Sequence, residues 1–190
     1  MAFELRPGQK PGDHPEFFRL PPPPGRSRES RIVLDARGRF WNGAVPIDHA
    51  GMAVAFASWI RRHPDDRRFI LTNGYDWTYF TVEDTPYFVR SVAIDGAEAR
   101  LTLFDGTEEL LDPETLSASD DGILYARVKG GAFEARFTPG AQASLVDAIV
   151  EGDGGAPALT LGGRQFPIPR RKPVDPCRGP SPGLGSAPKT

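Results

Sequence analysis

The chain has 190 residues and a mass of 20.7 kDa, enough for one medium domain or two small ones with a buried core. Fourteen of the twenty prolines lie in residues 1–30 and 167–190, so the composition predicts a compact centre between two disordered, Pro-rich tails, 1–30 and 170–190. The longest apolar run, residues 50–60, is about half the roughly 20 residues that a membrane-spanning helix needs, and a single cysteine, Cys177, excludes a disulfide scaffold.

Charge is divided along the same lines as composition. Residues 31–166 hold thirteen basic and twenty acidic side chains, whereas both tails are net positive. A negative body repels phosphate backbones, so we expect no nucleic-acid partner. Residues 1–7 have no basic stretch followed by an apolar one, as a signal peptide would. We therefore expect a cytoplasmic protein without membrane insertion.

The first part of the chain predicts a proline linker followed by a small unit of strands and one helix. Residues 21–25 are typical of a polyproline II linker, and order is expected to begin near Arg31. The predicted elements are strands at 32–34 and 39–41 joined by a turn at 36–38, a helix over 49–62 with Asp48 as its N-cap and Pro64 at its end, and strands at 68–72 and 77–82.

The helix expected over 49–62 is apolar around much of its circumference. Met52, Phe56 and Trp59 fall on one face at helical spacing, and alanine and valine widen that face. Such a helix is usually covered on two sides. The second cover is either the later predicted helix or a second copy of the chain, which makes an oligomer through this helix an open alternative.

The second part of the chain predicts an antiparallel meander and a further unit. Asp-Gly pairs between β-prone runs are strong hairpin signals, and Thr138-Pro139 is a typical helix start. The predicted elements are strands at 87–94, 99–104, 107–111, 123–128 and 133–137, a helix over 139–150, and a last hairpin at 159–161 and 165–168. The sequence thus predicts an α+β fold in which two hairpin–helix–hairpin units surround the meander, with an N-terminal unit at 31–82 and a C-terminal unit at 83–169.

Two stretches, residues 38–47 and 82–88, resemble the bacterial family known as domain of unknown function 1285. The order of elements agrees from about Arg31 to Pro169. The resemblance implies an α+β architecture with repeated motifs, partly similar to pleckstrin-homology-like barrels, and a suggested role in signalling. It implies a fold more directly than an activity.

The common catalytic signatures are missing from the sequence, including nucleophile elbows, Walker loops and zinc-ligand pairs, so we expect no cofactor and no metal. Glu83 and Asp84 are the most noticeable carboxylates. If they lie on a strand, they point to opposite faces and cannot form an acid/base pair with each other. We expect Asp84 to hydrogen-bond the backbone of the following turn, and Glu83 to pair with Arg68 or Arg90.

Aromatic and acidic side chains gather between the two predicted units. Such a group can bind a cationic or amide-bearing ligand, or it can simply fill the seam between the units. The candidate ligand-binding residues are Tyr75, Asp76, Trp77, Glu83, Asp84 and Tyr87. The sequence favours a non-catalytic binding or regulatory module that recognises a protein or a small ligand at this seam. The alternative is an enzyme that uses Glu83 or Asp84 as general acid or base.

Overall fold

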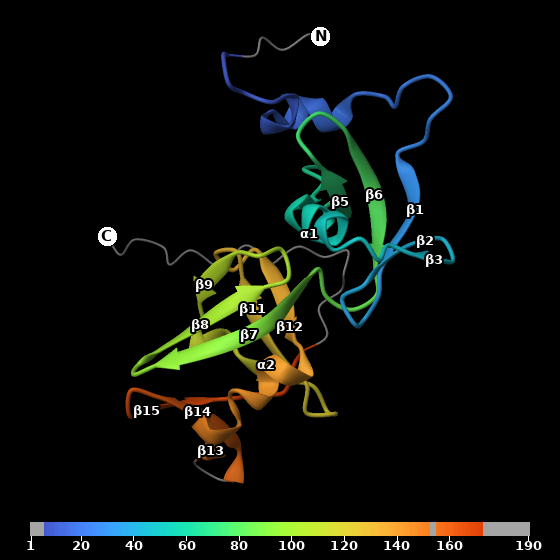
Figure 1. Ribbon diagram of the computed structural model, residues 1–190. Coiled ribbons are helices and arrows are strands. Elements are labelled where there is room, and N and C mark those ends of the chain that lie inside the picture. Colours follow the sequence, from blue (N-terminus) through green and yellow to red (C-terminus); the bar gives the residue numbers. More distant parts are fainter. Residues whose placement is uncertain (1–5, 153–154, 173–190) are drawn as a thin grey trace.

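The computed structural model describes residues 6–152 and 155–172. It contains mixed α and β structure, mostly strands with two short α-helices, and its three sheets follow one another from the top to the bottom of Figure 1. The strands are β1 (Glu29–Leu34), β2 (Phe40–Asn42), β3 (Val45–Pro46), β4 (Ile60–Arg62), β5 (Phe69–Thr72), β6 (Trp77–Val82), β7 (Tyr87–Asp95), β8 (Glu98–Leu103), β9 (Glu108–Leu110), β10 (Ser117–Ala118), β11 (Leu124–Val128), β12 (Phe133–Phe137), β13 (Ile149–Glu151), β14 (Pro157–Leu161) and β15 (Arg164–Pro167). The helices are α1 (Ala50–Ser58) and α2 (Pro139–Ala143), and the 3-10 turns are η1 (Pro11–Asp13), η2 (Pro15–Arg19), η3 (Pro113–Thr115) and η4 (Val146–Ala148).

The two six-stranded sheets share one pairing pattern. The first has the order β3-β2-β1-β6-β5-β4 and the second β10-β11-β12-β7-β8-β9. Each therefore consists of two antiparallel three-stranded meanders joined by one parallel pair between the first and the last strand, β1 with β6 and β7 with β12. A helical segment, α1 or η3, stands between the two meanders in each case. The pattern that repeats thus spans β1–β6 and β7–β12.

One cluster of buried side chains runs through all three sheets. Leu34 and Phe40 of the first sheet, Phe104 after β8, and Leu159 of the third sheet belong to it. The Phe40 and Phe104 rings are stacked with centroids 6.2 Å apart. The expected Asp-Gly hairpin at 95–96 joins β7 to β8, where Asp95 pairs with Glu98.

Both helices are shorter than the sequence predicts. α1 ends at Ser58, because Ile60 leaves the helix to pair with Leu71 of β5 and the Trp59 carbonyl accepts a hydrogen bond from Thr72 N–H. Its N-cap is His49 and not the predicted Asp48. The His49 Nδ1 accepts a hydrogen bond from Met52 N–H at 3.3 Å. Strand pairing with distant residues has overridden the helical periodicity.

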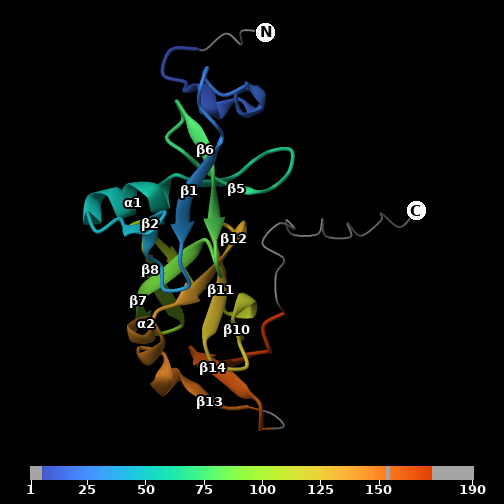
Figure 2. The ribbon, with the colours of Figure 1, turned by 90° about the vertical axis from the view of Figure 1, so that its right-hand side faces the viewer.

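The second helix also gives way to a strand. Thr138 is its N-cap, as expected, but α2 ends at Ala143, and residues 149–151 form β13 instead of a helical turn. α2 packs against β7 and β12. The two helices lie at different heights of the molecule in both ribbon views, so the later helix does not cover the first one (Figure 2). α1 instead places Phe56 edge-on against Phe40, with ring centroids 5.5 Å apart.

Both predicted tails contain ordered residues. η1 and η2 lie within the expected disordered tail 1–30, and Phe17 of η2 is buried against Ile70 and Trp77. The aromatic pair Phe17-Phe18 packs against the first sheet, which the high proline content of this segment does not predict. At the other end, Arg171 N–H donates to the Ala118 carbonyl at 2.7 Å, so order continues into the expected tail 170–190. Residues 173–190, and with them Cys177, lie outside the described residues.

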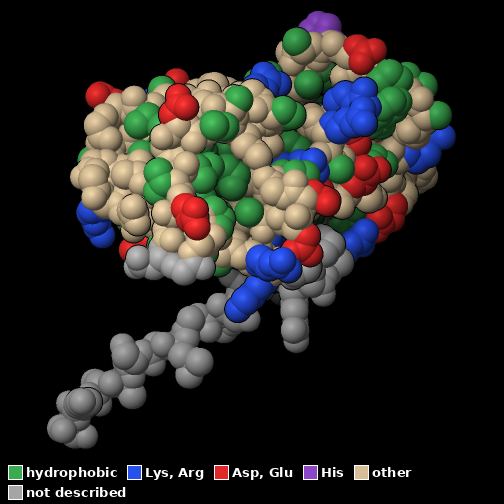
Figure 3. Space-filling model, turned by 90° about the horizontal axis from the view of Figure 1, so that it is seen from below, with side chains coloured by type: hydrophobic (Ala, Val, Ile, Leu, Met, Phe, Trp, Pro, Cys, Tyr) green, Lys and Arg blue, Asp and Glu red, His purple; other side chains and the backbone are tan. Residues whose placement is uncertain are grey.

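The surface of the described residues is mixed in character. Hydrophobic side chains on the underside are interspersed with single charges, and basic and acidic groups lie together toward the right (Figure 3). Within the described ranges, no helix has the length and apolar character needed to cross a bilayer.

Candidate functional site

A cavity of about 610 Å³ opens where the first two sheets meet. It lies between the β1–β2 loop, β7, the ends of β11 and β12, and α2. Its lining is mainly apolar, and its volume falls in the range of small-molecule sites. The lining residues are Ala36, Arg37, Phe88, Ile123, Arg136, Phe137, Thr138, Pro139, Gln142, Ala143 and Val146.

The β1–β2 loop forms one wall of this cavity, and its shape follows from two carboxylates. Asp35 accepts hydrogen bonds from the backbone N–H groups of Arg37 and Arg39, each at 2.9 Å, as aspartate commonly does in turns. Glu83 Oε2 accepts from Ala36 N–H at 3.1 Å. Gly38 has φ of +81°, and its Cα faces the Phe88 ring so closely that a Cβ would lie 3.0 Å from it. The loop is thereby fixed against β7.

Asp84 holds the opposite wall of the cavity. Its carboxylate pairs with Arg136 at 3.0 Å and with Arg171 at 2.9 Å, and it accepts the Tyr125 hydroxyl at 3.0 Å. Arg171 in turn pairs with Glu134 at 2.6 Å. Burial and the neighbouring Asp84 charge raise the pKa of Tyr125, so its hydroxyl stays a donor at neutral pH. The network fixes Arg136 at the cavity rim.

Two arginines supply the charge of the cavity. Arg37 and Arg136 are the charged members of its described lining, and no described carboxylate pairs with Arg37. The amide of Gln142 is already bonded to Leu124 N–H and the Gly122 carbonyl, and the Thr138 hydroxyl caps α2. An apolar space with two cationic groups at its edge suits a small molecule that combines an apolar body with an anionic group.

The first three candidate residues lie far from this cavity. Tyr75 is 65% exposed in the β5–β6 turn, and Asp76 pairs with Arg28 at 2.6 Å. Trp77 is buried, and the Arg28 guanidinium lies 4.5 Å from its ring centroid. The sequence predicts that Trp77 contributes to binding a cationic ligand. In the structure, the Arg28 guanidinium of the same chain occupies that position over the ring.

The other three candidates lie at the junction of the sheets. Glu83 and Asp84 support the two cavity walls, while Tyr87 is 1% exposed in the core. Burial, together with the nearby Asp105 charge, raises the pKa of Tyr87 to about 12. The length of β6, roughly 17 Å for its six residues, separates this group from Tyr75, Asp76 and Trp77. The structure thus places the six candidates in two groups instead of one seam.

The roles expected for the two acids are wrong in detail. Asp84 makes ion pairs and does not bond the following turn, which is instead closed by Thr85, whose hydroxyl donates to the Tyr87 carbonyl. Glu83 pairs with neither Arg68 nor Arg90, since Arg68 is engaged by Glu29 at 2.8 Å. Both acids lie in the bend between β6 and β7 and not on a strand, and they have different partners.

Sequence reasoning missed the residues that line the cavity. Phe88 and Arg136 each occupy one face of a strand, and the alternation of the strand gives no sign that this face borders a cavity. Arg171 stood in the expected tail. Local sequence indicates only the turn at 36–38, which carries Arg37, and the helix start at Thr138-Pro139. Among the described residues, no three His, Cys, Asp or Glu side chains are grouped closely enough to hold a metal ion.

The fold and the cavity define a mixed α/β protein built from two similar six-stranded sheets with a small-molecule-sized site at their junction. Two solved structures have the same fold. A DUF1285 family protein from Silicibacter pomeroyi matches with a TM-score of 0.61 and 19% identity, over 74% of this chain and 80% of that one. A DUF1285 family protein from Shewanella baltica matches with a TM-score of 0.52 and 18% identity, over 64% of this chain and 94% of that one.

These likenesses confirm, at the level of the fold, the resemblance noted in residues 38–47 and 82–88: the chain has a DUF1285-like fold. No protein-family model matches the sequence, and neither does any curated protein.

Proposed function

We propose that the protein is a non-catalytic binding module whose ligand is a small molecule with an apolar body and an anionic group, held in the cavity at the junction of the two sheets. One observation carries the proposal: a mainly apolar cavity of about 610 Å³ with Arg37 and Arg136 at its edge. The ligand would contact the β1–β2 loop of the first sheet and β12 of the second. A regulatory role, in which occupancy tightens the contact between the sheets, belongs to the same proposal.

The alternative of an enzyme has less support. Both acids on which it depends already have partners, since Glu83 accepts from the Ala36 backbone and Asp84 is shared by two arginines and a tyrosine. The described cavity lining contains no carboxylate, histidine, lysine or cysteine to move a proton.

Further parts of the proposal come from the sequence. They are a bacterial, cytoplasmic setting, a role in signalling, and a C-terminal unit at 83–169 that is partly pleckstrin-homology-like. Association of two copies through the first helix is also included. Its support is the exposed apolar surface of Met52 on α1 and Val45 on β3, which are 48% and 66% exposed.

Titration calorimetry with octanoate and 1-octanol tests the ligand class, because the two probes share an alkyl chain and differ in charge. We expect octanoate to bind the full chain at least five times more tightly than 1-octanol. Arg37→Gln should remove most of that difference in affinity, because it removes a cationic group from the edge of the cavity. The substitution breaks no ion pair among the described residues. Arg100→Gln, on the exposed side of β8, is the matched control and should leave it intact.

Two outcomes would contradict the proposal. One is equal affinity for the charged and the neutral probe in the unaltered chain. The other is a loss of octanoate binding that is the same in Arg37→Gln and Arg100→Gln. Val146→Asp, which puts a negative charge into the exposed rim of the cavity, should weaken octanoate more than 1-octanol.

A further inference from the structure

The N-terminal segment, residues 10–20, covers part of the outer face of β5 and β6. Side chains alternate along these strands: Phe69, Leu71 and Phe80 point to the main core, while Ile70 and Trp77 point outward. Phe17 of η2 lies against this outer pair and is 7% exposed. The segment therefore forms a second, separate apolar cluster on the side of the sheet that faces away from the core.

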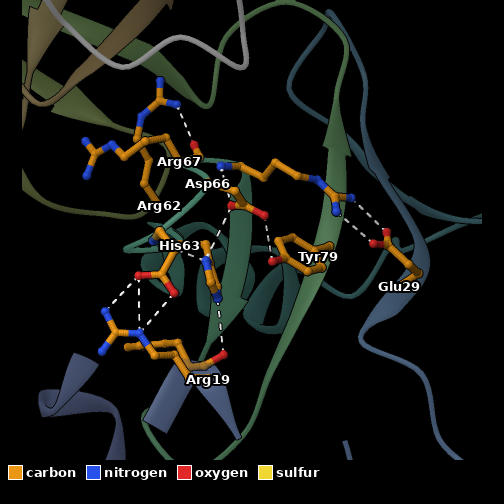
Figure 4. Close-up of polar contacts among 10 residues, drawn as sticks. Arg19, Glu29, Arg62, His63, Asp66, Arg67 and Tyr79 are labelled. Carbon is orange, nitrogen blue, oxygen red and sulfur yellow. Dashed lines mark hydrogen bonds and ion pairs between the residues drawn. The ribbon is translucent and has the colours of Figure 1, made fainter. Parts of the chain in front are cut away.

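Polar contacts also hold the segment on the sheet. Gly12 N–H donates to the Gly74 carbonyl at 2.8 Å, and the Phe18 carbonyl lies 3.1 Å from His63 Nε2. Arg19 pairs with Asp65 at 2.7 Å. Figure 4 shows His63 between the docked segment and Asp66, with the Tyr79 hydroxyl bonded to the other side of that carboxylate. These contacts define a site for an aromatic pair followed by an arginine.

The hold on the segment is shallow. Phe17 is its one buried side chain among the described residues, and the Arg19–Asp65 pair is about half exposed on both sides. Exposed ion pairs of this kind contribute little to stability. The linker at 20–27 is rich in proline and spans about 25 Å when extended, so the segment can leave without disturbing β1. Opening of such a segment costs much less free energy than global unfolding.

The covered face also has polar atoms that the segment does not satisfy. Trp77 is 6% exposed, and its indole Nε1–H has no acceptor among the described residues. The Nε–H of Arg28, whose guanidinium lies over the Trp77 ring, is likewise buried without an acceptor. Buried donors are normally paired, and unpaired ones mark functional or strained places. An occupant that supplies an acceptor to these donors forms hydrogen bonds that the chain's own segment does not form.

We propose that the outer face of β5 and β6 is a docking site for a peptide segment of a partner protein in which two adjacent aromatic side chains precede an arginine. Residues 10–20 are its tethered occupant and are displaced when such a segment binds. The aromatic side chain takes the place of Phe17 against Trp77, and the arginine pairs with Asp65. This site is independent of the cavity at the junction of the sheets.

A labelled peptide with the sequence of residues 9–20 tests the proposal by fluorescence anisotropy against two full-length proteins. One is the unaltered chain, and the other carries Phe17→Ala and Arg19→Glu to release its own segment. We expect the peptide to bind the released variant at least tenfold more tightly, because a tethered competitor acts at an effective concentration on the order of 1 mM. A peptide with Phe17→Ala should bind at least tenfold more weakly.

The ion pair provides a test of register. For this test the released variant carries Arg19→Ala in place of Arg19→Glu, so that its own segment cannot pair with an arginine at position 65. Asp65→Arg in that variant should weaken the peptide, and a peptide with Arg19→Asp should restore its binding. The proposal is overturned if the released variant, folded by circular dichroism, does not bind the peptide at millimolar concentration. It is equally overturned if the Phe17→Ala peptide binds as well as the original.

Hydrogen exchange on the unaltered chain keeps the proposal testable if the released variant does not fold. We expect the amides of Gly12 and Phe17 to exchange at least a hundredfold faster than that of Thr72, which donates to the Trp59 carbonyl within the fold. Equal exchange of all three through global unfolding would show that the segment is an inseparable part of the fold.

Discussion

At the scale of single residues, Asp84 connects three separate segments of the chain at the candidate site. It joins Arg136 of β12, Arg171 after the last strand, and the Tyr125 hydroxyl of β11. The two arginines face one carboxylate from different segments, and Glu134 supplies the second negative charge. If the Asp84 charge is removed, Arg136 keeps no acidic partner among the described residues and Arg171 keeps only Glu134. Asp84 therefore balances the charges of two arginines that come from different segments, β12 and the end of the chain after β15.

Replacement of Asp84 tests this balance. Asp84→Asn should lower the free energy of unfolding by roughly 3 kcal/mol, because it leaves two partly buried guanidinium groups close together. Glu83→Gln should cost less than about 1 kcal/mol, since an amide oxygen can still accept from Ala36 N–H. Urea denaturation of both variants measures the difference. Equal stability of the two variants would show that the Asp84 charge makes no contribution.

These contacts also explain what the sequence alone predicts and what it does not. The Asp95-Gly96 hairpin was predicted because the turn is encoded by neighbouring residues. The partners of Asp84 lie 41, 52 and 87 positions along the chain, so no local pattern indicates them. For the same reason the predicted end of the first helix, at residue 62, is wrong. The pairing of Ile60 with Leu71 depends on β5, which the helical periodicity of residues 49–62 does not indicate.

At the scale of elements, the β1–β2 loop connects the first sheet to the second. Gly38 in this loop has φ of +81°, and a Cβ at this position would lie 3.0 Å from the Phe88 ring of β7. Gly96, in the turn between β7 and β8, also has a positive φ, of +58°, but has open space around it. The two glycines thus share a backbone requirement and differ only in what a side chain would meet.

This pair of glycines gives a matched prediction. Gly96→Ala should cost about 1 kcal/mol, the penalty of a left-handed backbone for a residue with a Cβ. Gly38→Ala should cost about 2 to 4 kcal/mol, because displacement of Phe88 adds an overpacking penalty. Thermal denaturation followed by circular dichroism measures both. Equal costs would show that the loop does not press against β7 in solution.

At the scale of the whole molecule, the acidic body makes stability depend on pH. Burial by itself raises the pKa of Asp105, but hydrogen bonds from Lys129 and Thr107 outweigh burial and hold its pKa below the usual value of 3.8. A lowered pKa in the folded state stabilises the fold at pH values above the unfolded pKa. That stabilisation is lost as the pH falls through the folded value.

Acid titration of stability tests this linkage. The free energy of unfolding should decrease as the pH falls below about 4. Asp105→Asn should make this decrease shallower, because it removes one proton-binding difference between the folded and unfolded states. Lys129→Met, which removes the partner of the acid, should flatten the same part of the curve. Urea denaturation between pH 2 and 6 measures the slopes, and an unchanged slope in both variants would contradict the assignment.

The parallel pairs that join the meanders have a consequence for how the chain acquires its structure. In each six-stranded sheet the first strand lies beside the last one, β1 beside β6 and β7 beside β12, so the central pairing waits for the most distant partner. Such non-local contacts slow folding, because a long loop must close before they form. On a ribosome, β1 leaves the exit tunnel well before β6 and can pair only with the β2 hairpin until then. Each sheet is therefore completed in a single late step, with its edges formed before its centre.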